Sequence, residues 1–128
     1  MTARSMNPPG LHRPIGCYSQ VTRIGSMVAT AGMASIGLDG KVVGEGDIRA
    51  QTRQTLTNLL AALAGVGAEA KDVLKITVYL SDYALYEGMN EAYREVFGDN
   101  PPARATLKAD IVYPSLLVEM ECLAVVES

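Results

Sequence analysis

Alternating polar and apolar residues mark three segments of the chain, residues 73–81, 102–109 and 116–123, as strands with one apolar face. Two shorter segments, 17–24 and 27–35, have the composition of strands and flank Gly25-Ser26, a typical turn sequence. The pattern therefore predicts a pair of strands near the start of the chain and three further strands in its second half.

Apolar residues recur at helical spacing in two other segments. The first begins at Asp47, a suitable N-cap residue, and ends at the glycines of residues 65–67. The second runs from about residue 83 to 97, after the potential cap Asp82, and ends before a cluster of Gly, Asn and Pro. The order strand–strand–helix–strand–helix–strand–strand predicts an α+β sandwich in which both helices cover one face of a mixed sheet.

The length of 128 residues favours a single domain, residues 15–128, preceded by an extended arm, residues 1–14, that contains His12. We expect His12 to be solvated there. The longest apolar run is too short to span a bilayer, and the start of the chain lacks the apolar region of a secretory signal. We therefore expect a cytoplasmic protein that does not associate with membranes.

Charge and cysteine content exclude several classes of function. The net charge of -3 and pI near 5.1 offer no basic surface for nucleic acid. Cys17 and Cys122 lack metal or redox spacing, and with a single histidine the sequence predicts no metal site. Cys17 is expected to be a small buried residue, and no cofactor-binding motif is present.

The last two strands contain the strongest candidates for chemistry. If residues 111–115 form a turn, the strands pair antiparallel, and Arg104 shares a surface with Glu119 and Glu121. A guanidinium suits bidentate binding of a carboxylate, and Glu119 suits activation of a water molecule. Spacing alone, however, favours the alternative of a structural cross-strand ion pair.

The face of the sheet opposite the helices is predicted to mix charged and apolar side chains. The polar members are Lys75, Thr77, Tyr79, Arg104, Thr106, Lys108, Glu119 and Glu121. Leu117, Leu123 and Val125 are interspersed among them, so the face is poorly suited to remain a plain solvent surface. We infer a homo-oligomer that packs these faces together.

Six short segments together resemble the RidA family, also called YjgF or reactive intermediate deaminases. They are I-G-C-Y-S-Q at 15–20, T-A-G at 30–32, A-Q-T-R-Q-T-L-T-N at 50–58, M-N-E-A-Y at 89–93, and P-A-R at 102–104 with V-E-M-E at 118–121. The resemblance covers about residues 15–126. It implies a chorismate-mutase-like fold, a homotrimer with clefts between subunits, and hydrolysis of 2-imino or enamine acids to 2-oxo acids and ammonia without a cofactor.

The resemblance also assigns roles to residues. As in a 2-iminobutanoate/2-iminopropanoate deaminase, Arg104 would hold the substrate carboxylate and Glu119 would orient the attacking water. Tyr18, Ala31, Asn90 and Thr106 would line the cleft, and Glu121 would support the network. The chain departs from the family where Cys17 replaces a proline, Ala31 a serine, Met33 a glutamine and Thr106 a cysteine. These departures bear on the choice of substrate.

Three other functions remain open at the level of the sequence. A non-catalytic trimer could sense a small 2-oxo or amino acid through Arg104 without using Glu119. A pathway-specific deaminase could act on an enamine such as 2-aminomuconate. Some members of the family are described as ribonucleases or chaperone-like proteins, but the acidic pI and the lack of a basic, aromatic surface count against RNA binding.

Overall fold

The computed structural model describes residues 3–127 and contains two long helices within the two predicted helical segments. Helix α1 (Ile48–Ala64) begins after Asp47, whose carboxylate accepts a hydrogen bond of 3.1 Å from the Ala50 N–H. Helix α2 (Tyr86–Phe97) is preceded by the 3₁₀ turn η2 (Tyr83–Leu85). Asp82 caps that turn through the Ala84 N–H at 2.8 Å. Both predicted helices are thus confirmed.

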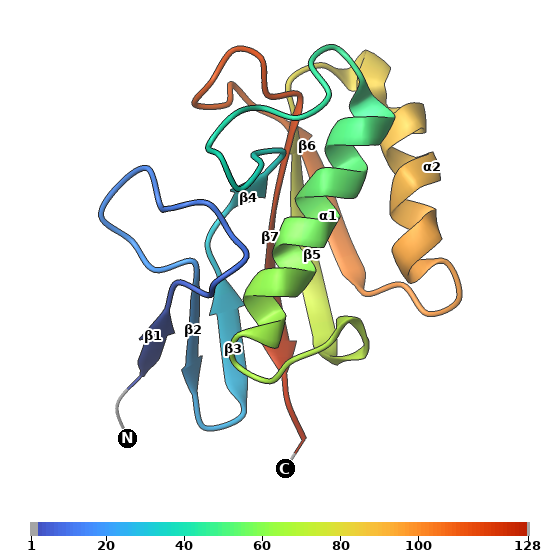
Figure 1. The fold of residues 1–128 in the computed structure, drawn as a ribbon. Coiled ribbons are helices and arrows are strands. Elements are labelled where there is room, and N and C mark those ends of the chain that lie inside the picture. Colours follow the sequence, from blue (N-terminus) through green and yellow to red (C-terminus); the bar gives the residue numbers. More distant parts are fainter. Residues whose placement is uncertain (1–2, 128) are drawn as a thin grey trace.

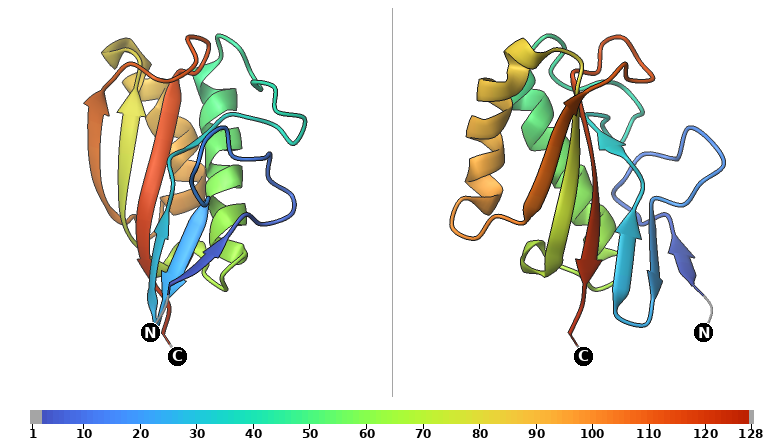
Figure 2. Two further views of the ribbon diagram at one scale, coloured as in Figure 1. Left: turned by 90° about the vertical axis from the view of Figure 1, so that its left-hand side faces the viewer. Right: turned by 180° about the vertical axis from the view of Figure 1, so that it is seen from behind.

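A single mixed sheet lies behind the two helices (Figure 1). Its strands are β1 (Arg4–Met6), β2 (Val21–Ile24), β3 (Met27–Thr30), β4 (Met33–Ala34), β5 (Val73–Leu80), β6 (Ala103–Lys108) and β7 (Val118–Val125). They are ordered β1-β2-β3-β7-β5-β6, with β4 paired to β7, and a 3₁₀ turn η1 (Ala70–Asp72) leads into β5. Both helices cover the same face of the sheet, which confirms the predicted α+β fold; the other face is turned toward the viewer in the right panel of Figure 2.

The predicted antiparallel pairing of the last two strands is wrong. Strand β6 pairs parallel with β5, and β7 pairs antiparallel with β5 on its other side. The reason is that β5, α2 and β6 form a strand–helix–strand unit, whose two strands lie parallel and adjacent. Strand β5 therefore separates β6 from β7.

This pairing also corrects the predicted faces. Arg104 lies opposite Ile76, which lies opposite Cys122, and Ile76 and Cys122 are both buried under the helices. Arg104 and the residues that alternate with it, Thr106 and Lys108, therefore belong to the helix-covered side of the edge strand. Glu119 lies opposite Tyr79, on the uncovered face. The prediction that Arg104 shares a surface with Glu119 and Glu121 is wrong.

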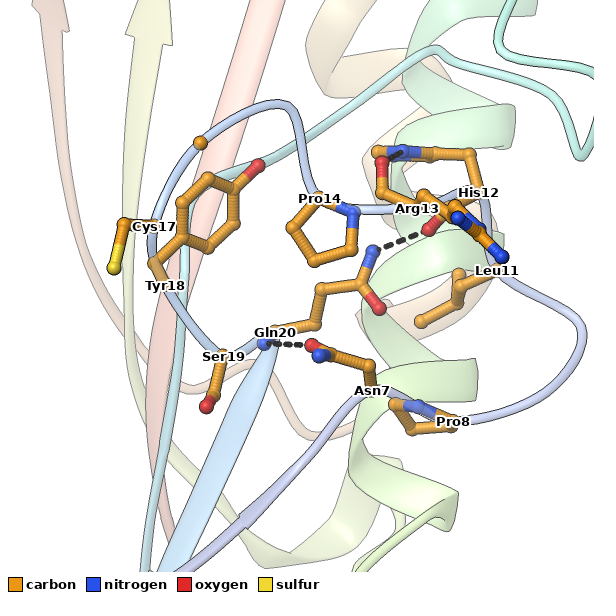
Figure 3. A pocket seen from close by; sticks show the side chains of 11 residues that line it. Asn7, Pro8, Leu11, His12, Arg13, Pro14, Cys17, Tyr18, Ser19 and Gln20 are labelled. Carbon is orange, nitrogen blue, oxygen red and sulfur yellow. Dashed lines mark hydrogen bonds between the residues drawn. The ribbon is translucent and has the colours of Figure 1, made fainter.

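The N-terminal segment is more closely integrated than an extended arm. Strand β1 pairs with β2, while residues 17–20 form part of a loop rather than a strand. His12 is buried with 7% of its surface exposed, and the Gln20 side-chain amide donates a 2.8 Å hydrogen bond to its carbonyl (Figure 3). Cys17 is exposed. The predictions of a solvated His12 and a buried Cys17 are both wrong, because this loop folds back over the domain with Cys17 on its outer side.

A buried amide joins helix α1 to the loop after β4. Asn58 is 4% exposed, and its Nδ2 donates hydrogen bonds to the carbonyls of Ala34 and Ile36 at 2.9 and 2.8 Å. The Asn58 Oδ1 accepts a hydrogen bond from Gln54 at 2.9 Å. Asn58 thereby ties helix α1 to the end of β4 and to the residues that follow it.

We predict that Asn58→Ala lowers the free energy of unfolding by about 1–3 kcal/mol, since it leaves the Ile36 carbonyl without a donor and removes one of the two donors to the Ala34 carbonyl. Urea denaturation followed by circular dichroism measures this loss. Thr57→Ala, on the exposed side of the same helix, is the control and should change stability by less than about 0.5 kcal/mol. Equal effects of the two substitutions would contradict the assigned role of Asn58.

Candidate functional site

The residues predicted to form one site lie in two separate hollows of this chain. Glu119, Tyr18 and Ala31 line one hollow, of about 310 Å³. Arg104 and Asn90 line the other, of about 350 Å³. Thr106 lies on the Arg104 side of β6, two residues further along the strand. Each hollow holds only part of the predicted machinery.

The Glu119 carboxylate fits into its hollow because the neighbouring residue, Gly32, has no side chain. The carboxylate lies against Gly32, where the Cβ of any other residue would come within 2.5 Å of Glu119 Oε2. The rest of the wall is largely apolar and includes Ile15, Ile36 and Leu116. Gly32 belongs to the T-A-G motif at residues 30–32, but only the structure shows that it makes space for the carboxylate.

No cation compensates the Glu119 carboxylate within residues 3–127: none of the salt bridges there involves it. Burial, followed by the negative charge of Glu121, raises the pKa of Glu119 above its ordinary value. Glu121 itself accepts a 2.6 Å hydrogen bond from the Tyr79 hydroxyl. This bond to Glu121 raises the pKa of Tyr79. Glu119 is thus a half-buried carboxylate poised to hold or release a proton.

Arg104 is held by aromatic residues of α2 rather than by a carboxylate. Its Nη2 donates a 3.0 Å hydrogen bond to the Tyr86 hydroxyl, and the guanidinium carbon lies 4.8 Å from the centre of the Tyr93 ring. Asn90, and after it the charge of Arg104, lower the pKa of Tyr86. Arg104 makes no ion pair in the described part of the chain. The alternative of a structural ion pair with Glu119 or Glu121 is therefore wrong for this chain.

Sequence reasoning missed Tyr86 and Tyr93 as the residues that position Arg104. They lie two turns apart on α2 and so share one of its faces, which was the available signal. The arrangement leaves the guanidinium fork without an anion, ready for a carboxylate of a ligand.

Other chemistry has little support in the described residues. Residues 3–127 contain no group of three or more His, Cys, Asp and Glu side chains that could hold a metal ion. Burial raises the pKa of Cys122 to about 11, so this thiol is a poor nucleophile at neutral pH. None of the helices in this part of the chain is both long and apolar enough to cross a membrane.

Comparisons with known proteins identify the family. The model of the family described as Endoribonuclease L-PSP matches residues 10–126. A RutC family protein of Pyrococcus abyssi is 38% identical over 112 residues, 88% of each chain. A protein of Acinetobacter baylyi named 3-aminoacrylate deaminase RutC is 32% identical over 117 residues, which cover 91% of this chain and 93% of the relative.

Solved structures agree with this assignment. A putative endoribonuclease of Thermotoga maritima superposes with a TM-score of 0.91 at 32% identity and covers 98% of both chains. The YjgF gene product of E. coli gives a TM-score of 0.88 at 27% identity over 97% of this chain and 99% of its own. The chain belongs to the Endoribonuclease L-PSP family, which is the YjgF/RidA family that its motifs resemble.

The raised pKa of Glu119 predicts a pH-dependent effect of Glu119→Gln on stability. The folded chain holds this proton more tightly than the unfolded chain, so stability falls as pH rises from the ordinary glutamate pKa through the raised value. The glutamine variant avoids this penalty. The free energy of unfolding of Glu119→Gln minus that of the wild type should therefore be larger at pH 7 than at a pH below the ordinary glutamate pKa.

Urea denaturation of both proteins across this pH range measures the difference. Glu45→Gln, which removes an exposed carboxylate outside the hollow, controls for the change in net charge. A stability difference between wild type and Glu119→Gln that is constant with pH would contradict the raised pKa.

Proposed function

We propose that the protein hydrolyses 2-imino and enamine acids, such as 2-iminopropanoate and 2-iminobutanoate, to 2-oxo acids and ammonia. The reaction would need no cofactor and would take place at clefts between the subunits of a homotrimer. The observation that carries the proposal is that Arg104 and Glu119 form no salt bridge within residues 3–127 and lie on opposite faces of one sheet.

Arg104 is the proposed carboxylate-binding group. Its two parallel N–H bonds would fix the acid group of the substrate and leave the adjacent C2 atom in a defined position. Tyr86 and Tyr93 hold the guanidinium, so little side-chain freedom is lost when the substrate binds. Asn90 and Thr106 would complete this side of the cleft.

Glu119 is the proposed general base. Its carboxylate takes a proton from a water molecule while the water oxygen forms a bond to C2 of the imine. The proton then passes to the nitrogen of the tetrahedral adduct formed from the protonated imine. As the C–N bond breaks and ammonia leaves, the Glu119 carboxylate takes the proton of the adduct's hydroxyl group, and the C=O bond of the 2-oxo acid forms. A pKa raised toward neutrality suits a group that both accepts and returns a proton. Tyr18 and Ala31 would form the wall beside it.

The uncovered face of the sheet provides the proposed contact between copies. Leu107 and Leu123 belong to it by their strand register and have 40% and 52% of their surfaces exposed, around the polar patch of Glu119, Glu121 and Tyr79. Packing the β6 edge of one copy against this face of the next would bring Arg104 toward Glu119. A head-to-tail contact of this kind closes into a ring.

The comparisons favour a small amino- or imino-acid ligand over RNA. The Acinetobacter baylyi relative is named for deamination of 3-aminoacrylate, and E. coli TdcF, 26% identical with a TM-score of 0.89, is described with bound serine. The ribonuclease activity that the family name suggests has less support in this chain. Its net charge is -3, and Glu119 and Glu121 lie on the uncovered face where phosphates would be repelled.

Glu119→Gln tests the enzyme against a non-catalytic sensor. The amide is nearly isosteric, so a 2-oxo acid should still bind to Arg104, whereas imine turnover should fall by about 10²-fold or more because the amide accepts no proton. Calorimetric titration with 2-oxobutanoate and an ammonia-release assay, with imines generated in situ from amino acids by an oxidase, measure the two quantities.

Arg104→Lys tests the proposed carboxylate-binding group in the same two assays. Lysine keeps the charge but loses the planar fork, so both binding and turnover should fall. If the wild type binds 2-oxobutanoate through Arg104 but does not accelerate imine hydrolysis, the sensor is favoured. Turnover of Glu119→Gln at the wild-type rate would instead remove Glu119 from the mechanism.

A further inference from the structure

His12 is a buried polar side chain that the proposed mechanism does not use. It is 7% exposed and lines the same hollow as Glu119 and Tyr18. Its backbone is fixed by the 2.8 Å hydrogen bond from the Gln20 amide, and Gln20 is in turn held through its N–H by Asn7 Oδ1 at 3.0 Å (Figure 3). The imidazole therefore has a defined place in the wall of the hollow.

One hydrogen bond fixes the tautomer of this ring. Nδ1 of His12 lies 2.8 Å from the carbonyl oxygen of Arg13. A carbonyl only accepts hydrogen bonds, so Nδ1 carries a proton and, in the neutral ring, Nε2 carries the lone pair. The one hydrogen bond that the ring makes to the described residues is this bond through Nδ1. The ring thus offers one acceptor that the protein itself leaves unused.

We propose that His12 selects the side chain of the substrate by accepting a hydrogen bond from a hydroxyl or amide group on it. The inference rests on the proposed function, which places the reacting carbon beside Glu119. The hollow holds the volume of roughly ten water molecules, so a substrate side chain that enters it comes near every wall.

The surroundings of His12 make this acceptor selective. The hollow is otherwise lined mostly by apolar side chains, among them Ile15, Ile36 and Leu116. An apolar substrate side chain would displace water from Nε2 and leave this acceptor unpaired, whereas a side chain with an O–H or N–H donor would satisfy it. The protein should therefore favour imino acids with a hydrogen-bond donor in the side chain.

Two imines of nearly equal shape test this preference. Amino-acid oxidase converts norvaline and homoserine to imines whose side chains differ in a terminal methyl or hydroxyl group. We expect wild-type kcat/KM to favour the hydroxylated imine by roughly three- to tenfold, the value of one hydrogen bond. His12→Leu should lower this ratio by the same factor, and His12→Gln, which keeps an acceptor, should restore part of it.

Arg13→Ala is the matched control, because Arg13 is exposed, follows His12 in the same loop and does not line the hollow. It should leave the ratio unchanged. A ratio that is the same in wild type and His12→Leu overturns the role of His12, while turnover of both imines still supports the proposed function. Failure of the wild type to hydrolyse either imine overturns the proposed function instead.

A measurement on the unaltered protein is independent of folding and of turnover. His12 is the single histidine of the chain, so its ¹⁵N imidazole signals are unambiguous. Titration with 4-hydroxy-2-oxobutanoate should shift the Nε2 resonance, and the isosteric 2-oxopentanoate should shift it less. Equal shifts, or none, with both acids at saturating concentration would overturn the proposal.

Discussion

The parallel pairing of β6 with β5 determines where the reactive groups of this protein lie. It places Arg104 opposite the buried Ile76, and hence on the helix-covered side of the sheet. Strand β7 pairs with the other edge of β5 and presents Glu119 opposite Tyr79, on the uncovered face. A layer of backbone therefore separates the guanidinium from the carboxylate within one chain. A site that uses both groups requires two copies of the protein.

Each half of this divided site carries an energetic cost. Glu119 forms no salt bridge with the described residues, and its burial, followed by the charge of Glu121, raises its pKa. Gly32 provides the space that this carboxylate occupies. Arg104 is desolvated in part by two tyrosine rings and has no anion nearby among residues 3–127. Uncompensated charges of this kind are typical of functional sites, where stability is given up for chemistry.

Much of the fold can be predicted from the local sequence. The predictions that were wrong concern features that depend on packing between distant parts of the chain. Asp47 and Asp82 mark helix starts because capping is a local interaction, and alternation marks β5, β6 and β7. The pairing of β6 was missed because the turn-like segment before β7 suggested a hairpin, although the strand–helix–strand order around α2 already favoured parallel neighbours. Leu74 is exposed because a bulge between Val73 and Lys75 breaks the alternation. The burial of His12 depends on contacts with Gln20 and the loop around it, which no local pattern reveals.

The central claim is that the site forms between chains, and complementation of two inactive variants tests it most directly. Arg104→Lys and Glu119→Gln chains are unfolded together in equal amounts and refolded, and light scattering confirms that the products are trimers. Clefts that combine Arg104 of one chain with Glu119 of another should restore about one quarter of wild-type turnover, as random mixing in a closed ring predicts. A trimeric mixture as inactive as each variant alone, or a protein that remains monomeric, would contradict this account.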